Sequence, residues 1–257
     1  MPVTDSIDIG KAITHLFEDK DWISKAIVGG LLALIPILGF AVAGYEVRVI
    51  RNVSRGEATP MPAWDDIGQM FMEGLWLGLA RIILGLPAAL LIVGPFVGFY
   101  FLIFFGALFA GNANSRDVEQ AVSVLVPAGL LASSLCCGLG ILYSFLLGVL
   151  FPAVAANYAR RGTFASCFNI GEVAGFIRRN PSNYLMVWLT GFLAGLIYAG
   201  AVSVVNFIPC LNLILVWPVS ALAIFWVYMT LGHAVGQLLA LDAAHPAASA
   251  PQLSPAS

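Results

Sequence analysis

Two long stretches of the sequence carry almost no charge. Residues 74–110 and 121–158 contain no acidic side chain, and the one basic residue in either stretch is Arg81. A helix needs about 20 apolar residues to cross a hydrocarbon layer of roughly 30 Å, so each stretch is long enough for at least one crossing. A water-soluble domain cannot bury this much contiguous apolar surface, and the sequence therefore predicts an integral membrane protein.

The composition of the whole chain supports the same class. Of the 257 residues, 60% are hydrophobic and 10% are charged, against roughly 25% charged in ordinary globular domains. The apolar residues form long runs and lack the alternation of a transmembrane barrel, so we expect an all-α, polytopic transmembrane helix bundle. The net charge of −2 provides no basic field, and nucleic acid is not an expected partner.

The apolar runs predict about six spans. They cover residues 23–50, the run 74–110 divided by a tight turn at Gly94 and Pro95, and the runs 121–158, 184–205 and 213–241. The run 121–158 fits either one long span that begins near Pro127 or a hairpin that turns at Gly138, which would give seven spans. All of them belong to a single transmembrane domain, 1–241, with halves 7–110 and 121–241. The segment 242–257 is rich in Ala, Pro and Ser and is expected to be a disordered tail.

Three amphipathic stretches are expected at the membrane interface. Residues 7–21 place Ile9, Ile13, Leu16 and Phe17 on one helical face, and residues 160–181 place three phenylalanines opposite Arg178 and Arg179. The third stretch, 51–73, follows the first span and contains two prolines and a tryptophan before an apolar helical face.

The two halves share a weak internal repeat. In each half a span ends in Arg-Gly, at Arg55-Gly56 and Arg161-Gly162, and an amphipathic helix and two more spans follow. With three crossings per half, the halves would be related by an inverted-topology axis, a plan that many transporters share.

The positions of lysine and arginine set the expected orientation, because cytoplasmic loops are enriched in both. In the six-span arrangement one side carries Lys11, Lys20, Lys25, Arg160, Arg161, Arg178 and Arg179, and the other carries Arg48, Arg51, Arg55 and Arg116. The first side is expected to be cytoplasmic, with both termini there, in a multi-pass protein of the bacterial inner (cytoplasmic) membrane. In the seven-span arrangement the loops at Arg48 and Arg160 share one side, which satisfies the charge rule better.

A series of residues at fixed spacings runs through the first half: Asp21-Trp22-Ile23-Ser24-Lys25, Gly29-Gly30-Leu31-Leu32, Ile35-Pro36, Gly44-Tyr45, Arg48, Arg51, Arg55-Gly56, Pro62-Ala63-Trp64-Asp65-Asp66 and Gly74. The second half continues with Pro152, Tyr158, Phe164, Phe168, Asn180, Tyr184 and Ile208-Pro209. This series, over about 17–237, resembles a bacterial and archaeal membrane-protein family catalogued as domain of unknown function 4013. The resemblance implies a multi-span prokaryotic membrane protein, and it implies no activity, substrate or catalytic residue.

Six residues are candidates for function. Arg81 is costly inside a membrane, so it is expected to snorkel toward head groups or to face the bundle interior. Trp64, Asp65 and Asp66 could dock a partner or hold a cation loosely; alternatively, one of the carboxylates caps the next helix and Trp64 anchors it at the interface. His233 and Gln237 share a face of the last span, which suits a proton relay, a ligand site or hydrogen bonds between helices.

The motifs of catalysis are absent from the sequence. It contains no phosphate-binding glycine loop, nucleophile elbow or metal-ligand spacing, so we expect neither an enzyme nor a cofactor or metal. We expect a non-enzymatic scaffold or accessory protein that acts within the lipid bilayer through packing, together with a protein partner or a second copy of the chain. The alternative is a small-solute or lipid transporter built on the inverted repeat.

Overall fold

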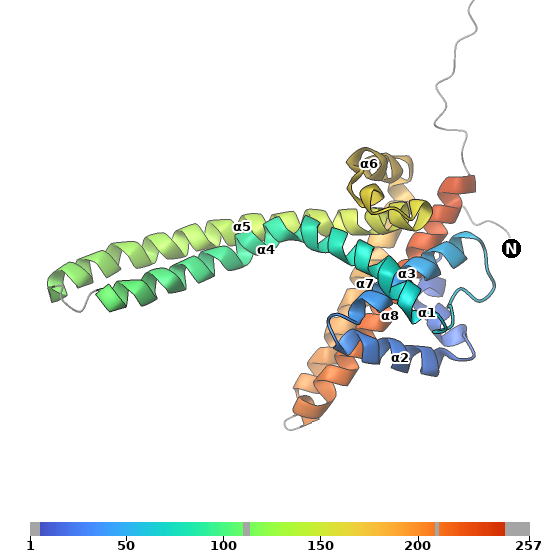
Figure 1. Ribbon diagram of the computed structural model, residues 1–257, viewed down its shortest axis with the longest axis horizontal. Coiled ribbons are helices and arrows are strands. Elements are labelled where there is room, and N and C mark those ends of the chain that lie inside the picture. The colour runs from blue at the N-terminus through green and yellow to red at the C-terminus, as the bar shows by residue number, and fades with distance from the viewer. Residues whose placement is uncertain (1–5, 110–113, 209–210, 245–257) are drawn as a thin grey trace, which may run out of the picture. The chain divides into compact units, whose positions relative to one another are not determined.

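The computed structural model describes residues 6–109, 114–208 and 211–244. All regular structure in these residues is helical, which confirms the predicted all-α class. The described chain forms two compact units (Figure 1): a base unit, residues 6–80, 151–208 and 211–244, and a hairpin unit, residues 81–109 and 114–150. The boundaries of these units differ from those of the two sequence halves.

The helices vary widely in length. Their bounds are α1 Ile9–Glu18, α2 Trp22–Leu34, α3 Gly39–Ser54, α4 Ile67–Phe109, α5 Ser115–Arg161, η2 Phe164–Phe168, α6 Ile170–Arg179, α7 Pro181–Asn206 and α8 Leu211–Ala244. Among the described residues, four helices are long and apolar enough to cross a membrane, namely α4, α5, α7 and α8. The sequence predicted six or seven spans, and the difference arises at three places.

The first difference lies in the predicted span 23–50. It consists of two short helices, α2 and α3, separated by a turn around Pro36. The turn satisfies its own backbone, because Ile35 N–H donates to Leu32 O and Gly39 N–H donates to Ile35 O. At 1.5 Å per residue the two helices are about 20 and 24 Å long, so neither crosses a hydrocarbon layer of roughly 30 Å alone.

The other differences lie in the two long apolar runs. The predicted turn at Gly94 and Pro95 is wrong, because α4 is a continuous helix of 43 residues with Pro87 and Pro95 inside it. The run 121–158 belongs to one helix of 47 residues, α5, which excludes the hairpin at Gly138. Proline is tolerated within apolar helices of membrane proteins, since a complete break would leave backbone groups without partners in hydrocarbon.

The hairpin unit is a pair of antiparallel helices. Tyr143 Oη donates to Leu84 O at 3.1 Å, and Cys137 Sγ lies 3.7 Å from Ile92 O. Farther along α4, the ring of Phe99 packs against Gly129. As the residue numbers increase along α4, the numbers of their contact partners on α5 decrease, which is the order expected of antiparallel helices. Large apolar side chains cover the outside of this unit, as expected of a surface in contact with lipid.

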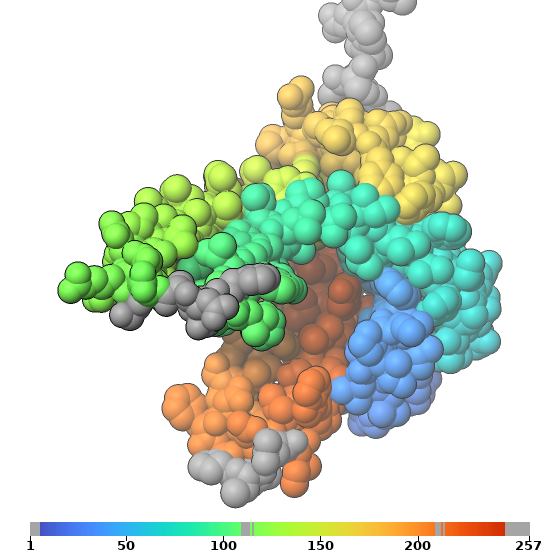
Figure 2. All heavy atoms as spheres, turned by 60° about the vertical axis from the view of Figure 1, so that its left-hand side comes forward, coloured from blue at the N-terminus to red at the C-terminus, as the bar shows by residue number. Residues whose placement is uncertain are grey.

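The base unit is built around α8. This helix packs against α1, α2, α3 and α7, and the space-filling view shows the blue N-terminal helices against the red and orange surface of α8 (Figure 2). Glycines allow close approach: Gly29 lies under the ring of Phe225, and Gly236 lies against Val53 and the carbonyl of Ile50. The amphipathic helix α1 buries Ala12, His15 and Leu16, whereas Phe17, which was predicted on the same apolar face, is exposed.

Short-range signals explain several helix ends. Asp8 accepts a hydrogen bond from Lys11 N–H at the start of α1, and Asn169 accepts one from Glu172 N–H at the start of α6. After α3 and α5 the chain leaves the helix through Gly56 and Gly162, whose φ values are 73° and 67°. Both Arg-Gly pairs of the repeat therefore end a helix in the left-handed conformation that glycine adopts without strain.

The C-terminal helix extends beyond the predicted last span. Helix α8 continues to Ala244, so Asp242 lies in its last turn and not in a disordered tail. The remainder of the predicted tail, 245–257, is outside the described residues.

Helices α3 and α4 cross with their backbones in contact. A Cβ atom at Gly44 would lie 1.7 Å from Met70 O, and one at Gly74 would lie 1.8 Å from Phe40 O. Both distances are far inside the van der Waals limit, so this crossing has room only for glycine at the two positions. Nine residues of α3 are buried, which leaves the helix little freedom to move away.

We predict that Gly44→Ala strongly destabilises the protein, because the methyl group would force α3 and α4 apart. Overpacking typically costs about 1–3 kcal/mol, and contact with rigid backbone should reach the upper end of that range. Gly68→Ala, in open space on α4, is the control and should be neutral or slightly stabilising. Thermal unfolding in detergent measures both variants, and equal stability of the two would contradict the described crossing.

Candidate functional site

A polar cleft lies between the C-terminal half of α3 and the start of α4. We call it the α3–α4 cleft. Its volume is about 370 Å³, and it is lined by Arg48, Arg51, Asn52, Arg55, Pro62, Ala63, Asp65, Gln69 and Glu73. The volume is within the 300–1,000 Å³ that is usual for ligand sites. Three arginines and two carboxylates line it, so it suits a charged ligand and not an apolar one.

Two of the arginines are fixed by neighbouring helices. Arg51 Nη1 lies 3.0 Å from Glu73 Oε2, and Arg51 Nε donates to Ala159 O at 2.9 Å. Arg48 Nη2 donates to Gln69 Oε1 at 2.8 Å, and its Nε lies 3.8 Å from Glu73 Oε2. Arg51 therefore joins α3 to α4 and to the last turn of α5, where exposed carbonyls attract a cation.

The third arginine and one carboxylate of the cleft do not link neighbouring helices. Arg55 and Asp65 are both exposed and both line the cleft. Within the described part of the chain, no ion pair or side-chain hydrogen bond involves either of them. The cleft thus contains a cation and an anion that are both available to a ligand.

The neighbouring Asp66 has a structural role. Its Oδ1 accepts a hydrogen bond from Gln69 N–H at 3.3 Å and so caps α4. A helix cap at one of the two carboxylates was one of the predicted alternatives. Its Oδ2 lies 3.4 Å from Arg48 Nη2. Asp65 and Asp66 are adjacent in sequence, but only Asp65 lines the cleft.

Trp64 connects α2 and α3. Its Nε1 donates to Lys25 O at 3.1 Å, and its ring lies 4.3 Å from the ring of Tyr45. The indole of Trp64 therefore bridges the first turn of α2 and the middle of α3, and the two helices lie side by side. Lys25 strengthens this junction, because its Nζ donates to Met61 O at 2.9 Å and pairs with Asp19 at 2.7 Å. The half-buried Trp64 packs within the base unit and does not form an exposed docking anchor.

His233 and Gln237 hold α1 against α8. Gln237 Nε2 lies 2.9 Å from His233 Nδ1 and donates to Asp8 O at 3.1 Å, and Gln237 Oε1 accepts from Asp8 N–H at 2.8 Å. The ring of His233 stacks on that of His15 at 4.3 Å, and both rings are buried. This geometry fits hydrogen bonding between helices, which was predicted beside a proton relay and a ligand site. No pattern in the sequence indicated that His15 would join this pair, since His15 and His233 are far apart in the chain.

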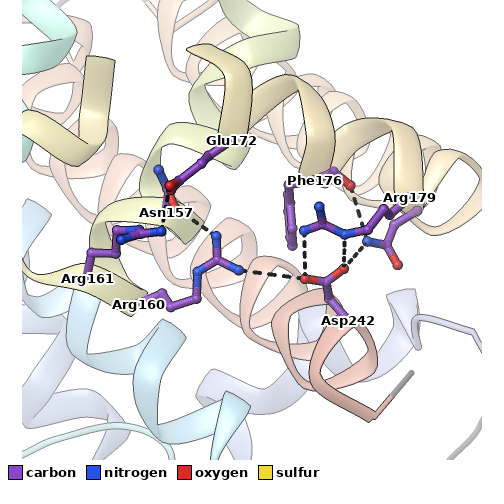
Figure 3. Close-up of polar contacts among 8 residues, drawn as sticks. Asn157, Arg160, Arg161, Glu172, Phe176, Arg179 and Asp242 are labelled. Carbon is purple, nitrogen blue, oxygen red and sulfur yellow. Dashed lines mark hydrogen bonds and ion pairs between the residues drawn. The ribbon is translucent and has the colours of Figure 1, made fainter. Parts of the chain in front are cut away.

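A second charged cluster joins three helix ends around Asp242 (Figure 3). Arg179 Nε and Nη2 each lie 3.2 Å from the carboxylate of Asp242, and Asn180 Nδ2 donates to Asp242 Oδ1 at 2.7 Å. Arg160 Nη1 lies 3.8 Å from the same carboxylate, and its Nη2 donates to Asn157. The ends of α5, α6 and α8 therefore meet at one carboxylate.

Arg81 lies within α4, where its side chain is half-buried. Glu73, the nearest acidic residue that precedes it in the helix, pairs with Arg51 and Arg48. Whether Arg81 snorkels or serves a function stays a prediction. In the described ranges, no group of three or more His, Cys, Asp or Glu side chains is placed to hold a metal ion.

We predict that the protein loses stability as the pH falls below about 6.5, the ordinary pKa of histidine. Burial lowers the pKa of His15, and Lys11 lowers it further, although the hydrogen bond to Ala12 O and the charge of Glu18 oppose the shift. The unfolded chain therefore takes up this proton at a higher pH than the folded chain, so acid favours unfolding. Thermal unfolding in detergent at pH 7.5 and pH 5 measures the effect. His15→Leu should reduce the pH dependence, and an unchanged dependence in this variant would contradict the assignment.

Comparison with known proteins places the chain in a family. A segment of 107 residues is 32% identical to an uncharacterized protein of Methanocaldococcus jannaschii, and it covers 40% of this chain and 36% of that relative. The match thus spans about a third of the length of the curated relative. No solved structure matches the chain. The model of the family described as protein of unknown function DUF4013 matches residues 28–207, which is more than half of the chain, and the protein therefore belongs to the DUF4013 family.

Proposed function

We propose that this protein is a non-enzymatic membrane scaffold or accessory component, which holds a rigid helical base at one face of the inner (cytoplasmic) membrane. The observation that carries the proposal is the role of its charged groups. Arg51, Asp242 and Lys25 each tie separate helices or loops together. Charged groups that are partly shielded from water and fully hydrogen-bonded make one arrangement of helices rigid, which suits a structural component.

The distribution of the candidate residues also favours a scaffold. A transporter is expected to gather its polar residues around one cavity near the middle of the membrane. Here Asp65 lines the α3–α4 cleft, whereas His233 and Gln237 bind α1 at another place on the base unit. The long apolar helices are also divided unequally, with α4 in the first half and α5, α7 and α8 in the second. This division does not support the transporter alternative, in which each half crosses three times.

The four long helices support a simple topology. Consecutive crossings alternate in direction, so α4 with α5 and α7 with α8 form two hairpins that begin and end on the same side of the membrane. In this topology α2 and α3 do not cross: the chain enters the membrane from that side and returns to it, because Trp64 links the start of α2 to the middle of α3. Ten of the twelve lysines and arginines then lie on this side, Arg81 lies within α4, and Arg116 lies at the opposite side. The charge rule makes the basic side cytoplasmic, with both termini there.

We predict that Ser6→Cys, Thr59→Cys and Ser249→Cys are all labelled from the cytoplasmic side by a membrane-impermeant thiol reagent. Asn114→Cys should be labelled from the other side. The experiment uses a background in which the four native cysteines are replaced. Position 59 is decisive, because a single crossing by 23–50 would place it opposite Ser6. Labelling of Thr59→Cys from the side that labels Asn114→Cys would refute the proposed topology.

We also predict that the base unit stays closed as a whole. In hydrogen exchange followed by mass spectrometry, peptides from α3 and the C-terminal half of α8 should be strongly protected and should exchange through uncorrelated local openings. A transporter instead needs its helices to move together between two states, so correlated exchange across α3, α7 and α8 would favour that alternative. Purification in mild detergent adds a second test, since a scaffold should retain a protein partner or a second copy in a fixed ratio.

A further inference from the structure

The α3–α4 cleft has the chemistry of a binding site for a small zwitterion. Its free charges have opposite sign, Arg55 and Asp65, and they are not paired with each other. The guanidinium is a strong donor to phosphate, and the carboxylate accepts hydrogen bonds from a primary ammonium group. A ligand that carries only one sign of charge would leave one of these two residues without a partner.

The walls of the cleft are held in place by interactions that a ligand does not need to break. Arg51 is fixed by Glu73 and Ala159, and Asn52 Nδ2 donates to Pro60 O at 3.1 Å, which positions the loop that carries Asp65. The loop is fixed on its other side by Tyr45 Oη, which donates to Pro62 O at 2.7 Å. A site that is organised before binding loses little conformational entropy when its ligand enters.

An apolar strip on α4 lies beside the cleft. Gln69 and Glu73 line the cleft, and Met72 and Trp76 follow within one turn of them on the same helix. Met72 and Trp76 are 47% and 41% exposed, so part of their apolar surface is open to a neighbouring molecule, although the ring of Trp76 also packs against Phe164. A ligand with a charged head in the cleft could therefore lay an acyl chain along α4.

We propose that the α3–α4 cleft binds a phosphate–amine zwitterion of the phosphoethanolamine type, with the phosphate on Arg55 and the ammonium on Asp65. The exposed Met72 and Trp76 favour the lipid form, phosphatidylethanolamine, over free phosphoethanolamine. This inference is independent of whether the protein acts as a scaffold or a transporter, because it rests on the residues of the cleft.

Native mass spectrometry of the full chain in detergent tests the proposal. The probes are short-chain phosphatidylethanolamine, phosphatidylcholine and phosphatidylglycerol, with free phosphoethanolamine as the soluble arm. We expect phosphatidylethanolamine to bind about tenfold more tightly than the other two lipids, because choline has no N–H to donate and phosphatidylglycerol has no cation. Equal retention of the three lipids by the wild-type protein would overturn the proposal.

Single substitutions assign each end of the ligand. Asp65→Asn should remove the preference for phosphatidylethanolamine over phosphatidylglycerol. Arg55→Gln should weaken the binding of both of these lipids about tenfold. Arg178→Gln is the control of equal charge change: it is exposed on α6, outside the cleft, and should leave binding unchanged. Unfolding temperatures confirm that the variants are folded, and a folded Asp65→Asn variant that keeps the wild-type preference would refute the assignment of the ammonium.

Trp76→Ala separates the two sources of the zwitterion. If the lipid is the ligand, this variant should bind phosphatidylethanolamine more weakly and free phosphoethanolamine unchanged. If the wild-type protein binds the free form as tightly as the lipid, the site stands and its ligand is the soluble molecule. Failure of the scaffold proposal would instead appear as correlated hydrogen exchange, with no effect on these affinities.

Discussion

The structure of the base unit depends on how closely the backbone of α3 approaches its neighbours. On one side, Gly44 and Gly74 bring α3 and α4 into backbone contact, and on the other side Gly236 of α8 lies against Ile50 and Val53. Close approach of this kind strengthens van der Waals packing, which is the main attraction between helices where lipid replaces water. It also positions Arg48 and Arg51 opposite Glu73, so the geometry of the α3–α4 cleft follows from the glycine crossing.

The charged residues of the base unit divide into two groups with different consequences. Several of them close helix ends: Asp242 receives the ends of α5 and α6, and Arg51 reaches the last turn of α5. Such interactions are strong where they are partly shielded from water, and they fix one arrangement of the helices. Arg55 and Asp65 have no such task in the described structure and both line the same cleft, which is why we infer a ligand there.

The long helices follow a different constraint, because hydrocarbon offers no partner for an open backbone group. Helix α4 passes through Gly94 and Pro95 without a break, and the turn between α2 and α3 bonds its own N–H groups. In a water-soluble protein the segments around Pro36 and around Gly94-Pro95 would both be typical of a turn. The difference lies in what surrounds them: Pro36 precedes a helix that is buried among neighbours, whereas Pro95 lies in the paired helices of the hairpin unit.

The sequence by itself determined the helical class, the membrane character, the family and the local ends of several helices, since these depend on composition and on neighbouring residues. Apolar runs without charge, the cap at Asp66 and the left-handed glycines after Arg55 and Arg161 are signals of this local kind. The tertiary structure alone decided which prolines interrupt a helix, that His15 stacks on His233, and that Asp65 lines a cleft while Asp66 does not. These outcomes depend on contacts between segments that are distant in sequence, and no spacing along one chain encodes which backbones approach closely enough to make them.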